Sequence, residues 1–258
     1  WAVVNQDDPA GTHMIEGTRA RVCRYGFGDG TRVRGRVLET GLAGSLFEVG
    51  GGDRESWRLT VRTPLVGRHN VTNCLAVLAA LHCLGGNLEA AVGRIESYTG
   101  VPGRLERIDG PDEVTAFVDY AHTPDALQSV LGVLRPLTRG RLFVVFGCGG
   151  DRDRGKRPLM GRAAEEGADV VILTNDNPRT EDAAAILDEI RTGLQTPAAV
   201  RSIPDRSEAV RTALREAAAG DVVLVAGKGH EDYQIIGTER RPLDDRQLVR
   251  EAMEQRHP

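Results

Sequence analysis

Short apolar runs alternate with amphipathic stretches along the chain after residue 100. Most of the runs are apolar throughout, which is typical of strands buried on both faces of a parallel sheet. The stretches between them have the length and spacing of helices. This alternation predicts a doubly wound α/β domain. The expected strands are Val114–Val118, Leu142–Phe146, Val170–Leu173, Ala199–Ile203 and Val222–Ala226, and the expected helices are Asp125–Leu134, Arg157–Glu166, Glu181–Leu194 and Arg206–Ala219.

The chain before residue 100 follows a different pattern. Apolar residues stand at roughly alternate positions in Val33–Leu38 and Ser45–Val49, which predicts half-buried antiparallel strands. The Ala- and Leu-rich stretch Val71–Cys83 predicts a buried helix that stops at the following Gly-Gly pair. A second helix is expected at Leu88–Ser97. This part therefore combines glycine-separated strands with two helices.

The segment YTGVPGR, residues 98–104, places two glycines and a proline within four positions. Such a cluster indicates a hinge, so we expect two domains, residues 1–100 and 101–258. The chain begins with Trp1 instead of Met, and its first residues read as a strand that runs into a loop. We therefore expect it to begin inside a domain.

Composition narrows the class of protein. The chain has 258 residues, of which 40% are hydrophobic and 27% charged, as in an ordinary globular protein. The net charge is −4 and no basic block occurs, so nucleic acid is not expected as a partner. No apolar run of about 18 residues is present, which argues against a membrane span. The four cysteines lie far apart without a CxxC pair, which predicts neither a zinc site nor a disulfide and favours the cytoplasm.

Four polar clusters follow the predicted strands: Asp119–Asp125, Gly147–Pro158, Thr174–Arg179 and Gly227–Gln234. In an open α/β sheet, ligands bind at the carboxyl ends of the strands. A single cluster of this kind is explained equally well by the local hydrogen bonds of a turn. Four clusters at one edge, which together hold Arg, Lys, His, Asp and Glu, favour a shared ligand site.

One cluster contains a sequence that matches part of a P-loop. Gly150–Lys156 reads GDRDRGK, but Arg157 stands where a P-loop needs Ser or Thr for Mg²⁺, and the positions between the glycines are charged. We therefore reject it as a P-loop, and the chain contains no other match. The positive charge, the glycines and the helix that follows could still bind an anion. The alternative is a solvated turn whose Asp and Arg residues neutralise each other.

The motifs in chain order resemble the Mur ligase family. They read GRHNVTNCLAVLAAL, GVPGRLERI, VDYAHTPDAL, FGCGGDRDRGKRPLMG, TNDNPRTED and AGKGHEDYQI. The resemblance implies three domains: one for a UDP-sugar, a central P-loop ATPase and a C-terminal Rossmann-like domain. This chain is similar to the later part of the central ATPase domain and to the whole C-terminal domain. The P-loop, a carboxylated lysine and most magnesium ligands would lie outside it.

Among Mur ligases, the motifs resemble those of the members that add meso-2,6-diaminopimelate. The resemblance implies an ATP-dependent amide ligase of peptidoglycan precursor synthesis that acts on UDP-N-acetylmuramoyl-L-alanyl-D-glutamate through an acyl phosphate. ATP and Mg²⁺ are the implied cofactors. No catalytic residue and no metal ligand is assigned within the chain, which we expect to be inactive alone. An L-lysine-adding or folylpolyglutamate-type ligase and a non-catalytic ligand-binding module remain alternatives.

The resemblance also implies a nucleotide site. Asn73 would contact the adenine, Arg104 the phosphates and Asp119 the ribose, with His122 close by. Asn73 could instead be a residue of a helix surface, although its apolar neighbours would make an unpartnered amide costly. Asp119 could instead cap the helix that begins near Thr123.

The amino-acid pocket implied by the resemblance consists of Arg152, Asp176, Asn177, Pro178, Arg179, Gly227 and Glu231. Diaminopimelate has a second ammonium and carboxylate far from the reacting amine. Arg179 supplies a planar fork for that carboxylate, aimed by Pro178, while the acids and carbonyls suit the ammonium. L-Lysine lacks the distal carboxylate and would leave the arginines unpaired. We expect Glu181 and Asp182 to interact with the dipole of the following helix and not with the ligand.

Overall fold

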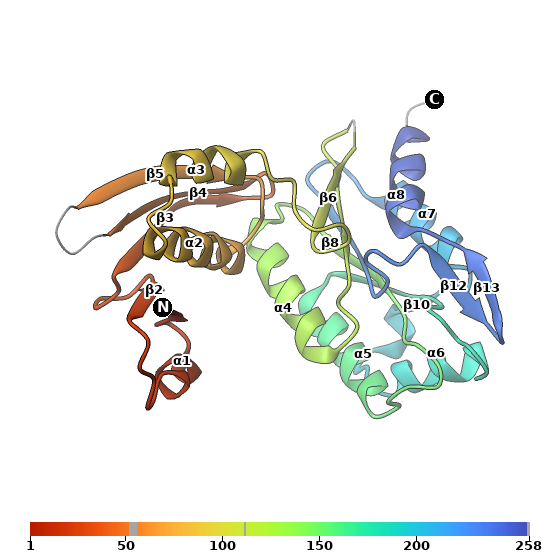
Figure 1. Ribbon diagram of the computed structural model, residues 1–258. Helices are drawn as coiled ribbons and strands as arrows, with labels where there is room; N and C mark the ends of the chain where they lie inside the picture. Colours follow the sequence, from red (N-terminus) through yellow and green to blue (C-terminus); the bar gives the residue numbers. More distant parts are fainter. Residues whose placement is uncertain (52–55, 111, 257–258) are drawn as a thin grey trace. The chain divides into compact units, whose positions relative to one another are not determined.

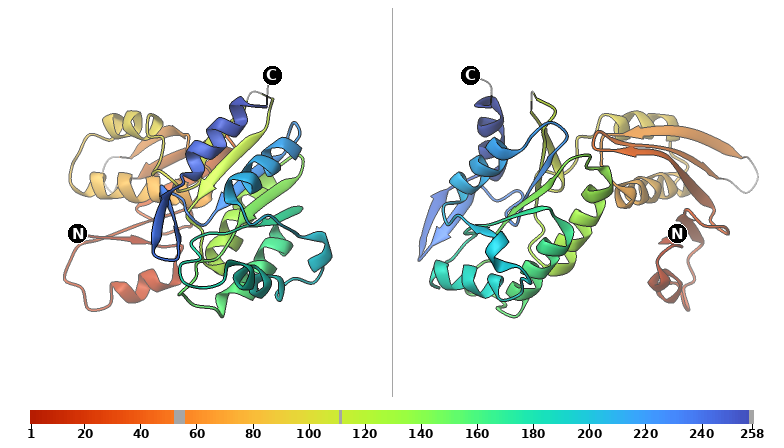
Figure 2. Two further views of the ribbon diagram at one scale, coloured as in Figure 1. Left: turned by 90° about the vertical axis from the view of Figure 1, so that its right-hand side faces the viewer. Right: turned by 180° about the vertical axis from the view of Figure 1, so that it is seen from behind.

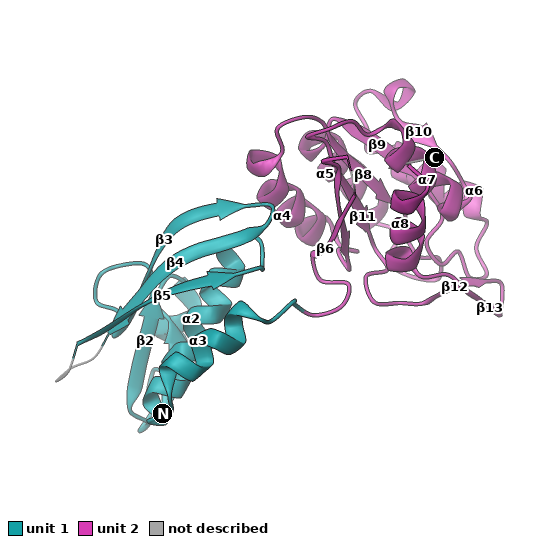
Figure 3. Cartoon of the chain, turned by 90° about the horizontal axis from the view of Figure 1, so that it is seen from above, with its two compact units in different colours: residues 1–100 teal, residues 101–258 magenta. Residues whose placement is uncertain are grey.

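The computed structural model describes residues 1–51, 56–110 and 112–256. They form two compact units, residues 1–100 and residues 101–258 (Figure 3). Each unit has its own sheet and its own cluster of buried apolar side chains. No helix in the described ranges is both long and apolar enough to cross a membrane.

The first unit contains a five-stranded sheet in the order β1-β2-β3-β4-β5. β1 pairs with β2 and β2 with β3 in parallel, whereas β3, β4 and β5 form an antiparallel meander. The antiparallel strands predicted at 33–38 and 45–49 are confirmed as parts of β3 and β4. The strands are β1 (Ala2–Asn5), β2 (Val22–Gly26), β3 (Val33–Gly41), β4 (Gly44–Gly51) and β5 (Trp57–Thr63).

Helix α2 (Arg68–Cys83) packs on this sheet and supplies much of the core. Leu75 and Leu78 of α2 are fully buried together with Phe47 and Val61 of the strands. The predicted helix is confirmed, although it begins three residues earlier than expected. α3 (Leu88–Glu96) follows, capped by the side chain of Asn87, and the short α1 (Pro9–Met14) lies between β1 and β2 in sequence.

The second unit contains a six-stranded sheet in the order β10-β9-β8-β11-β7-β6. All neighbours pair in parallel except β6, which is antiparallel to β7 at one edge. β7, β8 and β11 are buried at every position, as the unbroken apolar sequences of β8 and β11 predict, whereas β7 also buries Thr115 and Asp119. The strands are β6 (Glu106–Asp109), β7 (Thr115–Asp119), β8 (Leu142–Phe146), β9 (Val170–Leu173), β10 (Arg201–Ser202) and β11 (Val222–Ala226).

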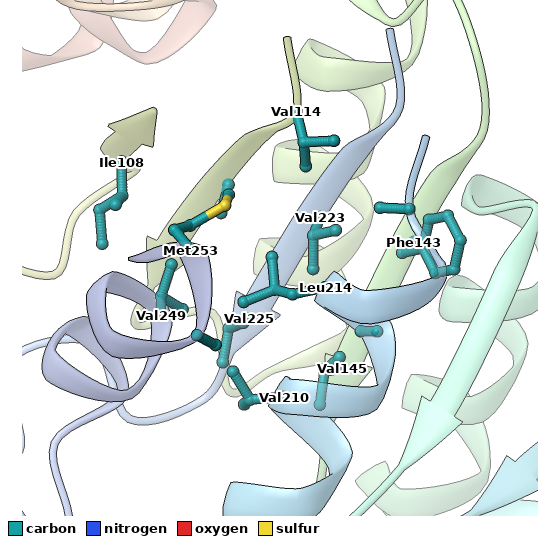
Figure 4. Close-up of a cluster of buried hydrophobic side chains, with 14 of the residues drawn as sticks. Ile108, Val114, Phe143, Val145, Val210, Leu214, Val223, Val225, Val249 and Met253 are labelled. Atoms are coloured by element: carbon teal, nitrogen blue, oxygen red, sulfur yellow. The ribbon is translucent and has the colours of Figure 1, made fainter. Parts of the chain in front are cut away.

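Helices cover both faces of this sheet (Figures 1 and 2). α4, α5 and α6 pack side by side, and α7 packs against α8 on the other face. On that face, side chains of β8 and β11 meet Val210 and Leu214 of α7 and Val249 and Met253 of α8 (Figure 4). The predicted doubly wound α/β fold is confirmed. The helices are α4 (Pro124–Leu134), α5 (Lys156–Gly167), α6 (Ala183–Arg191), α7 (Arg206–Glu216) and α8 (Asp245–Glu254), with 3₁₀ turns η1 (Arg135–Leu137) and η2 (Pro197–Ala199).

Several boundaries differ from the prediction. The strand expected at 199–203 is reduced to Arg201–Ser202, because η2 occupies the residues before it. The helix expected to begin at Glu181 begins at Ala183, because the Asp182 side chain accepts the Ala184 N–H at 3.0 Å and caps it. Edge strand β6 and the hairpin of β12 (Tyr233–Ile236) with β13 (Glu239–Pro242) complete the unit.

Candidate functional site

The carboxyl ends of the parallel strands meet at one edge of the second sheet. The register pairs Ala226 of β11 with Asp119 of β7, and Phe146 of β8 with Leu173 of β9. The loops that leave these strands are therefore neighbours. They are the four polar clusters of the sequence, so their predicted shared location is confirmed.

The loops after β8 and β9 interlock through their backbones. The Gly150 N–H donates to the Asn177 carbonyl at 2.9 Å. A Cβ at Gly150 would stand 1.9 Å from the Pro178 carbonyl oxygen, so only glycine permits this approach. The glycines of the 147–150 segment thus serve backbone packing between two loops.

Arg179 lies where these two loops meet. Its Nη1 donates to the Gly150 carbonyl at 2.8 Å, and its backbone pairs with β12 beside Ile236. Its Nε and Nη2 make no hydrogen bond within residues 1–51, 56–110 and 112–256, and no carboxylate there pairs with the guanidinium. The side chain is half-buried. It is an anchored cation with donors left for a ligand.

Arg152 lies beside Arg179 across Gly149. A Cβ at Gly149 would stand 2.9 Å from Nη1 of Arg179 and 3.8 Å from Cγ of Arg152. Arg152 is exposed and donates to the Asp151 carbonyl at 3.2 Å, and it too has no carboxylate partner in the part of the chain that the structure describes. The structure therefore brings the two predicted arginines together.

Asp176 and Gly227 form a second pair of predicted residues. Asp176 is 8% exposed, and no donor among the described residues bonds its carboxylate. A Cβ at Gly227 would stand 2.7 Å from Asp176 Oδ2, and Gly227 has a φ of 117°, so a side chain there would be both strained and crowded. A nearly buried carboxylate without a donor is an acceptor that suits an ammonium ligand.

The buried Asn177 and Lys228 form a hydrogen-bonded group with the half-buried Glu231. Asn177 donates to Glu231 at 3.0 Å, and its Oδ1 accepts from Lys228 Nζ at 3.0 Å and from the Ile235 N–H at 2.9 Å. Lys228 is fully buried, and burial lowers its pKa against the opposing effect of Asp176. Sequence reasoning missed Lys228 because GKG after a strand also suits an exposed turn.

Comparison with known protein families gives two matching family models, one within each unit. The Mur ligase middle domain matches residues 1–81, and the Mur ligase glutamate ligase domain matches residues 103–229. The chain belongs to the Mur ligase family.

Curated Mur ligases resemble the chain over nearly its whole length. The UDP-N-acetylmuramoyl-L-alanyl-D-glutamate--2,6-diaminopimelate ligase of Gloeobacter violaceus is 45% identical over 99% of the chain and 52% of its own length. The enzyme of the same name from Geobacter metallireducens is 43% identical over 97% of the chain and 52% of its own length. The chain thus spans about half the length of the curated relatives it matches.

Solved Mur ligase structures share the fold. A UDP-N-acetylmuramoyl-L-alanyl-D-glutamate--2,6-diaminopimelate ligase matches with a TM-score of 0.73 at 41% identity, over 100% of this chain and 53% of its own. A MurF ligase from Thermotoga maritima matches with a TM-score of 0.65 at 18% identity, over 99% and 54% respectively. The second likeness shows the fold alone.

A second group of predicted residues surrounds Tyr120 of this Mur ligase chain. The Arg104 guanidinium stacks 4.5 Å from the centre of the Tyr120 ring, and the His122 ring lies 4.6 Å from it. The His230 ring lies 5.3 Å from the same ring, a residue that sequence reasoning did not select. Arg104 and His122 are exposed. The group offers a cation and aromatic surface to a ligand.

Asp119 lies beside this group, and it does not cap the helix as the sequence had allowed. Thr123 is the cap, since its hydroxyl accepts the Ala126 N–H at 3.3 Å. The Asp119 carboxylate instead accepts the N–H groups of Leu105 and Ala121, each at 2.7 Å. It thereby fixes the segment that carries Arg104.

Asn73 lies on α2 of the first unit and is exposed. Its Nδ2 donates to Asn70 Oδ1 at 3.3 Å. The expectation that its amide would be costly among apolar neighbours is therefore wrong, because Cys74 and Leu75 face the core while Asn73 faces outward. His82 on the same helix packs its ring 5.6 Å from that of Trp57.

Glu181 and Asp182 play different parts, although the sequence assigned both to the helix dipole. Asp182 caps α6, but Glu181 pairs with the fully buried Arg157, whose Nη2 lies 2.8 Å from Oε1. The assignment was wrong for Glu181, since it bonds a side chain and not the helix. Hydrogen bonds from Arg157 and from the Asp151 N–H lower the pKa of Glu181 to about 2.

The structure gives no sign of a nucleophile or of a metal site among the described residues near the loops. Burial raises the pKa of Cys148 to about 12, so its thiol stays protonated at neutral pH. Within the described ranges, no group of three or more His, Cys, Asp or Glu side chains could hold a metal ion. The arrangement can bind and orient charged groups.

Proposed function

We propose that the second unit binds meso-2,6-diaminopimelate for an ATP-dependent amide ligation. One observation carries the proposal. After β9, Asp176 directly precedes Asn177 and Arg179 directly follows Pro178, and among the described residues the Asp176 carboxylate accepts no hydrogen bond while Arg179 keeps donors without acceptors. A cation and an anion that form no ion pair with the described residues suit a ligand that carries both charges. The curated relatives are named for 2,6-diaminopimelate.

Each predicted pocket residue receives a role in this proposal. Arg179 and Arg152 bind the distal carboxylate, the former with two parallel hydrogen bonds. Asp176, Glu231 and the Gly227 carbonyl accept from the distal ammonium. Asn177 and Pro178 hold the turn, because the Asn177 amide already bonds Lys228, Glu231 and β12. Together these contacts leave the other amine of the ligand to react.

The reaction joins that amine to a carboxylate of UDP-N-acetylmuramoyl-L-alanyl-D-glutamate. A free carboxylate is a poor acceptor because hydroxide would have to leave, so phosphorylation by ATP supplies a better leaving group. The neutral amine then attacks the acyl phosphate and phosphate departs. Most of the acceleration in such a step comes from holding the amine in line with the carbonyl, which is the task of this pocket.

Residues of this chain also suit a nucleotide. Arg104 can contact phosphates, and the rings of Tyr120 and His122 offer stacking surface, while Asp119 beside them remains proposed for the ribose. Asn73 remains proposed for the adenine. Mg²⁺ would accompany ATP, and we assign no ligand for it within this chain. We further propose a cytoplasmic enzyme of peptidoglycan synthesis, because its precursor is a UDP-sugar.

A ligation assay tests this function. The full-length protein that contains this chain is supplied with the UDP-sugar dipeptide, Mg-ATP and either diaminopimelate or L-lysine. We expect ADP release and product formation with diaminopimelate. With lysine we expect a reaction that is less efficient by about a hundredfold or more, because lysine leaves Arg179 unpaired. Preference for lysine would contradict the proposal.

Substitution of Arg179 tests the carrying observation. Arg179→Ala should raise the KM for diaminopimelate by about a hundredfold, the equivalent of one charged bidentate contact, and leave the KM for ATP nearly unchanged. Arg139→Ala is the matched control, because this exposed arginine precedes β8 at the opposite edge of the sheet. Equal effects on both substrates would point to misfolding and against a ligand contact.

A further inference from the structure

Arg157, Glu181 and Glu189 form an ion-pair cluster next to the loops that carry Arg152 and Arg179. Arg157 lies in the first turn of α5, and its side chain is 0% exposed. Its Nη1 donates to Glu181 Oε2 at 2.9 Å, and its Nη2 to Glu181 Oε1 at 2.8 Å. Nη1 also donates to Glu189 Oε2 at 2.7 Å. The contact with Glu181 is therefore bidentate, the geometry in which an Arg-carboxylate pair is strongest.

Glu181 connects this cluster to both ligand loops. Its Oε1 accepts the Asp151 N–H at 2.5 Å, and Arg157 Nη2 also donates to the Gly149 carbonyl at 3.3 Å. Asp151 in turn accepts the Thr180 hydroxyl at 2.8 Å and the Thr180 N–H at 3.3 Å. The Arg157–Glu181 pair thus clamps residues 149–151 to residues 178–181.

The backbone inside this clamp is strained. Asp151 has a φ of 54° and Arg179 a φ of 52°, a region that residues other than glycine seldom adopt. Such a conformation persists only where surrounding contacts fix it, and strain of this kind concentrates at binding sites. Here the two strained residues are the direct neighbour of Arg152 and Arg179 itself. The clamp supplies the contacts that hold them.

We propose that Glu181 and Arg157 are positioning residues that set the preference for a ligand with a distal carboxylate. The inference rests on the proposed function and deepens it. Neither residue is among those to which the proposed function assigns a contact with the ligand. They act by fixing the Arg179 guanidinium, and a preorganised fork binds more tightly than one that must be ordered on binding. L-Lysine has no group for this fork, so its binding does not depend on the clamp.

Calorimetric titration of the 258-residue chain with diaminopimelate tests the inference. The affinity for L-lysine is measured in the same way by a competition titration, in which diaminopimelate displaces bound lysine. Glu181→Gln keeps the shape of the side chain but turns an amide N–H₂ toward Arg157. We expect affinity for diaminopimelate to fall about tenfold or more and affinity for lysine to change less than about twofold. Selectivity between the two ligands should therefore fall by about the same tenfold.

Glu189→Gln is the matched control. Glu189 pairs with the same Arg157 and with the exposed Arg154, but it bonds none of the residues 149–151 and 178–181 that the clamp joins. We expect this variant to lower the melting temperature to a degree similar to Glu181→Gln while it keeps the wild-type selectivity. If Glu181 has a purely structural role, both variants should lower the affinity for both ligands by similar factors, and that result would overturn the inference.

The outcomes separate this inference from the proposed function. If the wild-type chain prefers diaminopimelate and Glu181→Gln keeps that preference, only the clamp is wrong. If the wild-type chain binds lysine as well as diaminopimelate, or neither, the proposed function fails and the clamp with it. Should Glu181→Gln not fold, Arg157→Lys decides, because it retains the charge but loses the fork and should show the same selective loss.

Discussion

Glu181 is held in its ionised form by Arg157 and by the Asp151 N–H, and these bonds give its stability contribution a definite pH range. Its pKa falls from 4.5 to about 2 on folding. The unfolded chain therefore binds the proton more readily than the folded one. The contribution is fully present above pH 4.5 and is lost as the pH falls toward 2.

Replacement of Glu181 should remove this pH dependence. We expect Glu181→Gln to be less stable than the wild type at pH 6, and the difference to shrink steadily between about pH 4.5 and pH 2. Urea unfolding midpoints for both proteins across this range provide the measurement. A difference that stays constant from about pH 6 to pH 2 would show that Glu181 does not titrate as described.

The site also shows what a sequence hides about single residues. Arg179 and Asp176 could be selected from the sequence because they stand in a motif after a strand. Lys228, Arg157 and Glu181 could not, since an arginine in a charged run reads as solvated whether or not it is buried. Arg157 is fully buried because α5 places it between Glu181 and Glu189, which are distant in sequence.

At the scale of elements, one buried ion pair connects the starts of two helices to two strands. Arg206 in the first turn of α7 donates to both oxygens of Asp245 in the first turn of α8, at 2.8 and 2.7 Å. It also donates to the carbonyl of Ala226 at the end of β11 and of Asn175 after β9. Both side chains are 0% exposed. The pair fixes the face opposite α4, α5 and α6.

Removal of one partner should be costly. We expect Asp245→Ala to lower the free energy of unfolding of the second unit by about 3–5 kcal/mol, because Arg206 would remain buried without a counterion. Asp244→Ala removes the cap of α8 and an ion pair with Arg246 and leaves no buried charge without a partner, so it should cost only about 1 kcal/mol. Urea denaturation of both variants measures these values.

A double variant checks the cause of that loss. Arg206→Met with Asp245→Leu replaces both charges by apolar groups of similar size, and should be clearly more stable than Asp245→Ala. If the double variant is less stable than the single one, hydrogen bonds to the strand ends and not the unpaired charge account for the effect.

At the scale of the whole molecule, the second unit has a complete core of its own. Residues of β6, β7, β8 and β11 pack with α7 and α8 in a single cluster (Figure 4), and the predicted pocket residues all lie within residues 101–258. A unit with its own core can fold alone.

We therefore expect residues 101–258, produced separately, to unfold cooperatively in urea. They should bind diaminopimelate within about threefold of the affinity of the whole chain, since the proposed pocket needs no other residue. Circular dichroism and calorimetric titration measure the two properties. A folded unit without affinity would show that residues 1–100 contribute to the pocket.

The sequence by itself determined the alternation of strands and helices from β7 to β11 and the edge at which the polar loops gather, but not β6, β12, β13 or α8. It could do so because unbroken apolar runs need burial on both faces, and parallel strands send their carboxyl ends to one edge. Motif resemblance also selected Arg179, Asp176 and Gly227. The sequence predicted the ends of helices and strands less well. For example, α6 begins at Ala183 and not at Glu181, because Asp182 caps it.

Only the tertiary structure decided which charges are satisfied. Asp119 fixes backbone amides, Asn177 bonds three partners and Glu181 clamps two loops, whereas Arg179 keeps free donors. Several of these bonds join residues far apart in sequence, from 24 positions for Arg157 and Glu181 to 51 positions for Asn177 and Lys228, which local pattern does not encode. The difference between a charge that the fold satisfies and one that is proposed to bind a ligand is a property of the folded loops.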